Sequence, residues 1–449
     1  APDRAEELAL KVDRDGSGSL NPLEFLACMR LLRDIELECV RRLMKAADVD
    51  GDGTLDVTEL PELLHGLGYE PWDLQVINEA LEDAGLFELG DSPQLGLGDV
   101  WRFLIEYRRR EGFSRRDLRS LQQVFHQQDQ DNSGELDNLE APLALRKFGF
   151  AVGFNEVQSW LLKVDVDESG ALNIVEFHKL ARMLQSSEMN RFRTAFRAEA
   201  KESKTLSSDT AVIVLARLGY DASIWEMFLG EKLTESQFLT LCFRFLQMRR
   251  EECLRNEGWD AKQMQWLKNV FKNYDTAGSG YIAKQDLIRL LVDVLPNMSR
   301  DPLFRPQLRA ILRQVQVETT GRLSFHDFQT FLQLCRTAQE KTVARRQHAA
   351  MEETGFSQAE AQEFRDLFLS AGQTPGCINF EEIWKMLNST TPLGHNLTLE
   401  LLQMFNEQLM KRSEFYTDPE LEHALDFADF LRFMRNLMDI NFAHLIRKV

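Results

Sequence analysis

The chain has 449 residues, more than one hydrophobic core usually organises, so three or more domains are expected. Its 71 acidic side chains against 53 basic ones give a formal charge of −18. This balance argues against nucleic acid and anionic membranes as partners and favours a cation or a basic protein. No apolar run approaches the roughly 18 residues that a membrane span needs, so no membrane span is predicted.

The six cysteines lack both CxxC spacing and Cys/His metal spacing, and most lie within apolar helical runs. We therefore expect reduced core thiols and a cytoplasmic protein, with a cytoskeletal or ciliary location as the narrower alternative. The chain begins at Ala1 without a signal-peptide pattern, which favours a processed chain or a segment of a longer protein.

In chain order, the first motif is a twelve-residue acidic segment, and three more of the same spacing follow before residue 180. Such a segment suits Ca²⁺, which takes six to eight oxygen ligands. Side chains at positions 1, 3 and 5 supply oxygens, position 7 supplies its backbone carbonyl, and position 9 acts directly or through water. A glutamate at position 12 closes the shell with both oxygens. The four segments are DRDGSGSLNPLE from Asp13, DVDGDGTLDVTE from Asp48, DQDNSGELDNLE from Asp129 and DVDESGALNIVE from Asp165.

Two further positions of each segment fit the same structure. Glycine at position 6 permits the positive φ that the turn requires, and leucine at position 8 can pair with a neighbouring loop as a short strand. One such segment alone could be a coincidental acidic turn, whereas four complete matches predict four calcium sites. The predicted metal ligands are Asp13, Asp15, Ser17, Ser19, Asn21 and Glu24; Asp48, Asp50, Asp52, Thr54, Asp56 and Glu59; Asp129, Asp131, Ser133, Glu135, Asp137 and Glu140; and Asp165, Asp167, Ser169, Ala171, Asn173 and Glu176.

The flanking residues carry a resemblance. Apolar residues follow the first loop at helical spacing, as Leu23, Phe25, Leu26 and Met29 do. With the four loops, this pattern resembles the calmodulin and troponin C superfamily. The resemblance implies an all-α fold of paired EF-hands, in which each loop lies between two helices and two loops join through their position-8 residues.

Seven weaker matches, with an apolar residue at position 8, bring the number of motifs to eleven. They lie around Leu95, Leu206, Leu233, Ile282, Leu323, Ile378 and Leu425. We expect five pairs and leave Leu20, in the first loop, without a partner. The pairs are Leu55 with Leu95, Leu136 with Leu172, Leu206 with Leu233, Ile282 with Leu323, and Ile378 with Leu425.

These pairs predict about five and a half calmodulin-like lobes in an elongated tandem array. Gly-aromatic-polar triplets ending at Ser114, Asp260 and Ser357 separate the lobes, and these three residues are expected to be helix N-caps. The predicted domains are a single hand at 1–33, a pair at 34–111, a pair with both loops complete at 112–187, a degenerate pair at 188–256, a partly degenerate pair at 257–340 and a degenerate pair at 341–449.

One incomplete loop, which begins at Asp275, keeps part of the ligand set. The segment DTAGSGYIAKQD keeps Asp275, Ser279 and Gly280, but it has Ala277 at position 3 and the shorter Asp286 at position 12. This set favours Mg²⁺ or a vacant site over Ca²⁺. The remaining loops have lost most oxygens, so we interpret them as hands that keep the packing without the metal.

No nucleotide-binding loop, nucleophile elbow or kinase signature occurs, so an enzyme is not expected. The preferred hypothesis is a calcium-responsive binding or scaffold subunit whose partners are proteins, as helical or filament segments. One alternative is a structural rod associated with the cytoskeleton or axoneme and stabilised by calcium. The other is the regulatory EF-hand region of a larger enzyme or channel.

Overall fold

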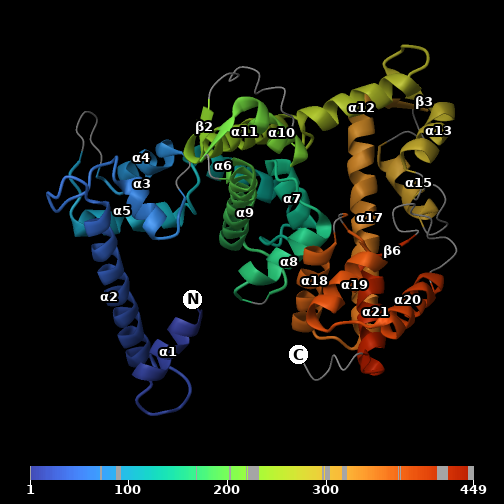
Figure 1. Cartoon of the computed structure of the whole chain (residues 1–449). Coiled ribbons are helices and arrows are strands. Elements are labelled where there is room, and N and C mark those ends of the chain that lie inside the picture. Colours follow the sequence, from blue (N-terminus) through green and yellow to red (C-terminus); the bar gives the residue numbers. More distant parts are fainter. Residues whose placement is uncertain are drawn as a thin grey trace. The chain divides into compact units, whose positions relative to one another are not determined.

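The computed structural model describes residues 2–442 except 71–72, 87–92, 168, 202–203, 219, 221–231, 296–297, 299–303, 316–320, 373, 375 and 412–422 (Figure 1). The described part contains nineteen α-helices and six strands of two or three residues. The expected all-α class is therefore confirmed. No described helix is both long enough and apolar enough to cross a membrane.

The chain forms two compact units. The first unit comprises residues 1–123 and 181–245. Three helices, α6, α9 and α11, extend across a limit of this unit. Its elements are α1 (Pro2–Val12), α2 (Pro22–Ala47), α3 (Leu60–Gly66), α4 (Leu74–Asp83), α5 (Leu97–Arg109), α6 (Arg115–Gln128), α9 (Ile174–Ala200), β1 (Thr205–Ser207), α10 (Ser208–Arg217), β2 (Lys232–Thr234) and α11 (Glu235–Arg255).

The second unit comprises residues 124–180 and 246–449. Its longest helix, α17, runs without interruption from one hand pair into the next (Figure 1, orange). Its further elements are α7 (Glu140–Phe148), α8 (Phe154–Val164), α12 (Ala261–Tyr274), β3 (Tyr281–Ala283), α13 (Lys284–Val294), α15 (Arg305–Gln314), β4 (Arg322–Ser324), α17 (Phe325–Thr354), α18 (Gln358–Ala371), β5 (Ile378–Asn379), α19 (Phe380–Thr390), α20 (His395–Met410), β6 (Ala424–Leu425) and α21 (Phe427–Asp439).

All five predicted pairings of position-8 residues are confirmed. Leu55 and Leu95 exchange backbone hydrogen bonds of 3.1 and 2.9 Å, and Leu136 and Leu172 exchange two of 2.8 Å. The other three pairs form short antiparallel ladders, β1–β2, β3–β4 and β5–β6. None of these ten side chains is more than 5% exposed. The first halves of the Leu95, Leu233 and Leu323 loops lie largely outside the described residues.

The first hand differs from the others, as the sequence indicated. Among the described residues, Leu20 pairs with no strand or bridge. The two residues directly after its loop remain exposed, Phe25 to 53% and Leu26 to 56%. In the paired hand of the Asp165 loop, the residues at the same two positions, Phe177 and His178, are 0% and 9% exposed. In the described part of the chain no second loop pairs with the first, which agrees with this exposure, because the two hands of a pair cover each other's apolar face.

Phenylalanine supplies the largest side chains of the described cores. The twelve bulkiest side chains with less than 2% exposure are all phenylalanines. Separate apolar clusters lie in the segments 40–107, 267–335 and 350–442. Phenylalanine buries a large apolar area without a polar atom that needs a partner, which explains its excess over tyrosine in the composition. The limits of the six predicted domains stay a prediction.

The predicted helix caps are present. The Asp260 and Ser357 side chains each accept a hydrogen bond from the amide three residues later and form capping boxes with Gln263 and Glu360. Ser114 accepts from the Asp117 amide at 3.1 Å. Gly355, which ends α17, has a φ of +69°, a conformation that glycine adopts at low cost.

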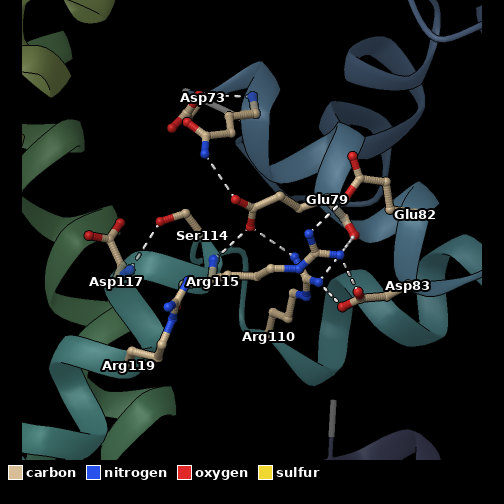
Figure 2. A network of polar contacts seen from close by, with 10 residues as sticks. Asp73, Glu79, Glu82, Asp83, Arg110, Ser114, Arg115, Asp117 and Arg119 are labelled. Atoms are coloured by element: carbon tan, nitrogen blue, oxygen red, sulfur yellow. Dashed lines mark hydrogen bonds and ion pairs between the residues drawn. The ribbon is translucent and has the colours of Figure 1, made fainter. Parts of the chain in front are cut away.

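A buried polar network fastens the end of α5 to α4 and to the start of α6 (Figure 2). Arg110, 4% exposed, donates at 3.1 Å to Glu79, which is 8% exposed, and also pairs with Asp83. The backbone amide of Arg115 donates to the same Glu79 carboxylate at 2.6 Å, while its side chain pairs with Glu82 at 2.7 Å. The junction between two successive hand pairs is therefore stabilised by ion pairs and hydrogen bonds around the buried Arg110 and Glu79, which solvent cannot readily reach.

All six cysteines are free thiols, and only Cys39 is not fully buried. Burial raises the pKa of Cys335 and of Cys253 to about 12. Since only the thiolate reacts, these two thiols should be modified about 1000-fold more slowly at pH 8 than an ordinary thiol. We expect a thiol reagent to label Cys39 first and a C39S variant to lose the fast phase. Labelling of Cys335 at the rate of Cys39 would contradict this prediction.

Candidate calcium sites

The four complete loops share one backbone arrangement. The position-1 aspartate accepts a hydrogen bond from the amide of the position-6 glycine, and this bond closes the turn. Each of these glycines has a positive φ, between 74° and 86°, where other residues are strained. The bonds run from Gly18 to Asp13 at 2.9 Å, from Gly53 to Asp48 at 3.0 Å, from Gly134 to Asp129 at 3.0 Å and from Gly170 to Asp165 at 2.9 Å.

The glutamate at position 12 bends back over each loop. One oxygen accepts from the amide at position 2 and the other from the amide at position 9. The same two bonds occur in all four loops. They hold the position-12 carboxylate on the side of the loop where the other predicted calcium ligands lie. The distances are 3.1 and 3.1 Å for Glu24, 2.7 and 3.0 Å for Glu59, 3.1 and 3.3 Å for Glu140, and 2.9 and 3.2 Å for Glu176.

Three of the loops bring carboxylates close enough to share one ion. In each, three carboxylate oxygens from different residues lie within 4.8 Å of one another. Within 129–140, all of which is described, no such triple occurs. Hard oxygen donors at this separation fit Ca²⁺, and these side chains would hold it. The three groups are Asp13, Asp15 and Glu24; Asp48, Asp50 and Asp52; and Asp165, Asp167 and Glu176.

Nearby negative charges help to raise the pKa of two loop carboxylates, Asp50 and Glu140, whereas hydrogen bonds within the loops help to lower the pKa of Asp15, Asp48, Asp56, Asp131 and Asp167. Although the Asp52 amide hydrogen bond acts to lower it, the pKa of Asp50 is raised, because desolvation and the charges of Asp52 and Glu59 prevail. Burial raises the pKa of Glu140, and the charges of Asp137 and Asp131 act in the same direction. A divalent cation would relieve both repulsions, which is the electrostatic basis for binding there.

The remaining predicted ligands are already bonded within the loops. The position-5 hydroxyls of Ser17, Ser133 and Ser169 donate to the position-7 carbonyls of Ser19, Glu135 and Ala171 at 2.9, 3.0 and 3.2 Å, so both oxygens lie together. The hydroxyl of Thr54, at position 7, lies 2.6 Å from side-chain oxygens of Asp52 and of Gln94 and donates its one hydrogen to one of them. The position-9 side chains accept from amides at the start of the following helix, as Asn21, Asp56, Asp137 and Asn173 do.

A second role of position 12 was missed by sequence reasoning. Its side chain also caps the following helix, because it accepts from the amide at position 9. This bond survives in hands that have lost their other ligands, at 3.2 Å for Asp99, 3.0 Å for Gln237 and 2.8 Å for Glu382. The repeated acid or amide at position 12 of the degenerate hands was the available signal. Position 12 can thus be retained for helix stability alone.

The incomplete loop from Asp275 keeps only the first half of the arrangement. The amides of Ser279 and Gly280 donate to Asp275 at 2.9 and 2.7 Å, as in the complete loops. Among the described residues, however, the Asp286 carboxylate accepts no hydrogen bond from its loop. The Asp286 carboxylate therefore does not close over its loop as the position-12 glutamates of the complete loops do.

Comparison with known proteins agrees with this geometry. A family model described as EF hand matches residues 40–64. The chain is 26% identical to calcium-binding protein CML19 of Arabidopsis thaliana over 32% of this chain and 81% of that protein. It is 25% identical to troponin C isoform 1 of Homarus americanus over 27% of this chain and 79% of that protein. With calcium-dependent protein kinase 19 of Arabidopsis thaliana it is 27% identical over 38% of this chain, but the match spans only 29% of the kinase.

Fold, loops and comparisons together define a calcium-binding EF-hand protein. Within that class, the chain is similar to calmodulin-like proteins and to troponin C.

The charge of the ligand set predicts the order of calcium affinities. The Asp48 loop offers five carboxylates, the Asp129 loop four, and the loops from Asp13 and Asp165 three each. Since ligand charge helps to set EF-hand affinity, the Asp48 loop should bind tightest, and the Asp129 and Asp165 loops should bind cooperatively. Calorimetric titration of variants that each keep one complete loop measures this order, and a variant that keeps both the Asp129 and the Asp165 loop measures their cooperativity. An Asp48 loop weaker than the other three would refute the argument from charge.

Proposed function

We propose that this protein is a calcium-responsive scaffold subunit without catalytic activity of its own. Hand pairs with complete loops would sense calcium, and pairs without ligands would hold protein partners, as helical or filament segments. One observation carries the proposal. In the second unit, the pair with both loops complete is bonded directly to the last pair, in which the loops have lost their ligands.

The contact lies between α8 of the complete pair and the α17–α18 corner. Asn155 accepts from Gln347 at 2.7 Å and from Arg365 at 3.2 Å. The Ser159 carbonyl accepts from Gln362 at 3.0 Å. These bonds join residues separated by about 200 positions in the sequence, and side-chain packing along α8 surrounds them.

A buried ion pair strengthens the same connection. Both terminal nitrogens of Arg146, on α7, donate to the two oxygens of Glu340, on α17, at 2.8 Å. Each residue is 8% exposed. A two-pronged arginine–carboxylate pair fixes orientation as well as distance. Helices α7 and α8 both belong to the complete pair, so both of its inner helices are attached to α17 and α18.

This arrangement supports transmission of a calcium signal. Helix α8 ends at Val164, and its C-cap residue, Asp165, is the first residue of a calcium loop. In sensor hands, capture of the position-12 glutamate changes the angle between the two helices of a hand. A change at Asp165 and Glu176 would therefore move α8 against α18, because no flexible segment separates the loop from the contact.

Hydrogen–deuterium exchange along α17 and α18, with and without calcium, tests the proposal. We expect calcium to change exchange in these helices, which contain no calcium loop, and an E176Q variant to lose the change. E156Q, which alters a glutamate on α8 outside the loop, is the matched control. Unchanged exchange in α17 and α18 of the calcium-loaded chain would overturn the responsive role.

The structural-rod alternative has support of its own. All three pairs without complete loops keep their strand ladders. If the protein is a rod stabilised by calcium, hydrogen exchange should become uniformly slower near the loops. Exchange at the α8–α18 contact should then stay unchanged when calcium binds. The same measurement therefore separates the two functions.

A further inference from the structure

The contact between α8 and the α17–α18 corner encloses a cavity of about 290 Å³. Most of its wall is apolar, formed by Phe154, Leu161, Leu162, Met351 and Ala361. Arg365 lies in the same wall. The volume is near the lower end for small-molecule sites, which suits a compact ligand.

Arg365 is the unusual feature of this cavity. It is 7% exposed, yet its partners are neutral. One terminal nitrogen donates to the side-chain oxygens of Asn155 and Gln347 at 3.2 and 3.1 Å. The guanidinium carbon lies 4.2 Å from the centre of the Phe427 ring.

Arg110 and Arg146, which are also buried, face carboxylates. Among the described residues, no carboxylate lies within ion-pair distance of Arg365. Burial lowers the pKa of Arg365 to about 10, while the charge of Asp366 acts in the opposite direction, so the group stays charged at neutral pH. A buried charge without an opposite charge is costly, and an anion in the adjacent cavity would offset that cost.

The guanidinium also keeps free donors. Its Nε and second terminal nitrogen donate to no described residue, and neither is sealed from solvent. These two N–H groups form one edge of the guanidinium, whose two parallel donors match the two oxygens of a carboxylate. The Asp165 carboxylate also lines the cavity, but its oxygens accept from the amides of Ser169 and Gly170 at 3.1 and 2.9 Å.

We propose that this cavity is a binding site for a small monocarboxylate with an apolar body, in which the carboxylate meets the free edge of Arg365 and the apolar body lies against Phe154 and Leu161. The proposed function is not a premise of this site. Because Asp165 and Gly170 of a calcium loop line the cavity, the site is tested in calcium-free protein, so that binding of the ion does not enter the result.

Benzoate is the probe, and benzamide, which has the same shape without the charge, is the control ligand. Calorimetric or NMR titration of the full chain in the presence of a chelator should give saturable binding of benzoate and at least tenfold weaker binding of benzamide. R365Q should weaken benzoate binding at least tenfold. Equal binding of the two ligands, or no saturation up to about 10 mM benzoate, would overturn the site.

A second pair of variants keeps the test decisive if R365Q does not fold. Leu162 lines the cavity but is 37% exposed, so substitution there should be tolerated. L162E places a negative charge at the cavity and should weaken benzoate binding several-fold, whereas L162Q, of equal size, should change it little. Equal affinities in L162E and L162Q would overturn the proposal. None of these results bears on calcium-dependent exchange in α17 and α18, so the two proposals can fail separately.

Discussion

Replacement of Arg110 by methionine is expected to cost about 3–5 kcal/mol of stability, because it leaves a buried carboxylate without its counter-charge. Glu79 is 8% exposed, and Arg110 donates to its side chain and also to its backbone carbonyl at 3.1 Å (Figure 2). Asp83 loses one of its two arginine partners in the same substitution. The cost should appear as earlier unfolding in urea and faster hydrogen exchange in α4 and α5.

Two variants separate the buried charge from other effects. R109M removes the neighbouring arginine, whose side chain is 79% exposed, and should change stability by less than about 0.5 kcal/mol. In E79M/R110M both members of the pair are apolar, and much of the lost stability should return. An R110M chain as stable as R109M would show that the network of Figure 2 adds no stability.

The second large effect is expected at Glu59, where glutamine should lower calcium affinity of the Asp48 loop by about 100-fold or more. The substitution removes one negative charge and one of the two oxygens that close the shell. It also places an amide donor against the amides of Val49 and Asp56, which now donate to Glu59 at 2.7 and 3.0 Å. Calorimetric titration should show the loss of the tightest site.

The matched control is E62Q, which makes the same chemical change three residues later. Glu62 is exposed, lies in the first turn of α3 and belongs to no loop. Its replacement should leave the titration unchanged. If E59Q kept the affinity of the unaltered chain, Glu59 would not be a ligand, and the interpretation of the Asp48 loop would be wrong.

The degenerate hands of this chain show how a hand can lose its oxygen ligands without losing its fold. Their position-8 residues remain paired and buried, and the position-12 side chain still caps the following helix. Both interactions are independent of any ion. Loss of the oxygens at positions 1, 3 and 5 therefore removes calcium binding at little cost to packing.

Local spacing was sufficient for much of this structure. The turns from Asp13, Asp48, Asp129 and Asp165, the partners of the position-8 residues and the caps at Asp260 and Ser357 could all be predicted. The turns and the caps depend on residues a few positions apart, whose geometry the backbone imposes by itself. The pairings could also be predicted. Each loop has one aliphatic residue at position 8, and this residue becomes buried when it pairs with the position-8 residue of a second loop.

The sequence by itself thus determined the calcium loops, the pairing of the hands and the all-α class. Only the tertiary structure decided that Arg146 meets Glu340, that α8 packs on α18 and that Arg365 is buried among neutral partners. Those contacts join residues about 200 positions apart or depend on the surroundings of a single charge. Helical periodicity indicates which face of a helix is apolar, but the helix that covers this face is selected by the packing of the whole unit.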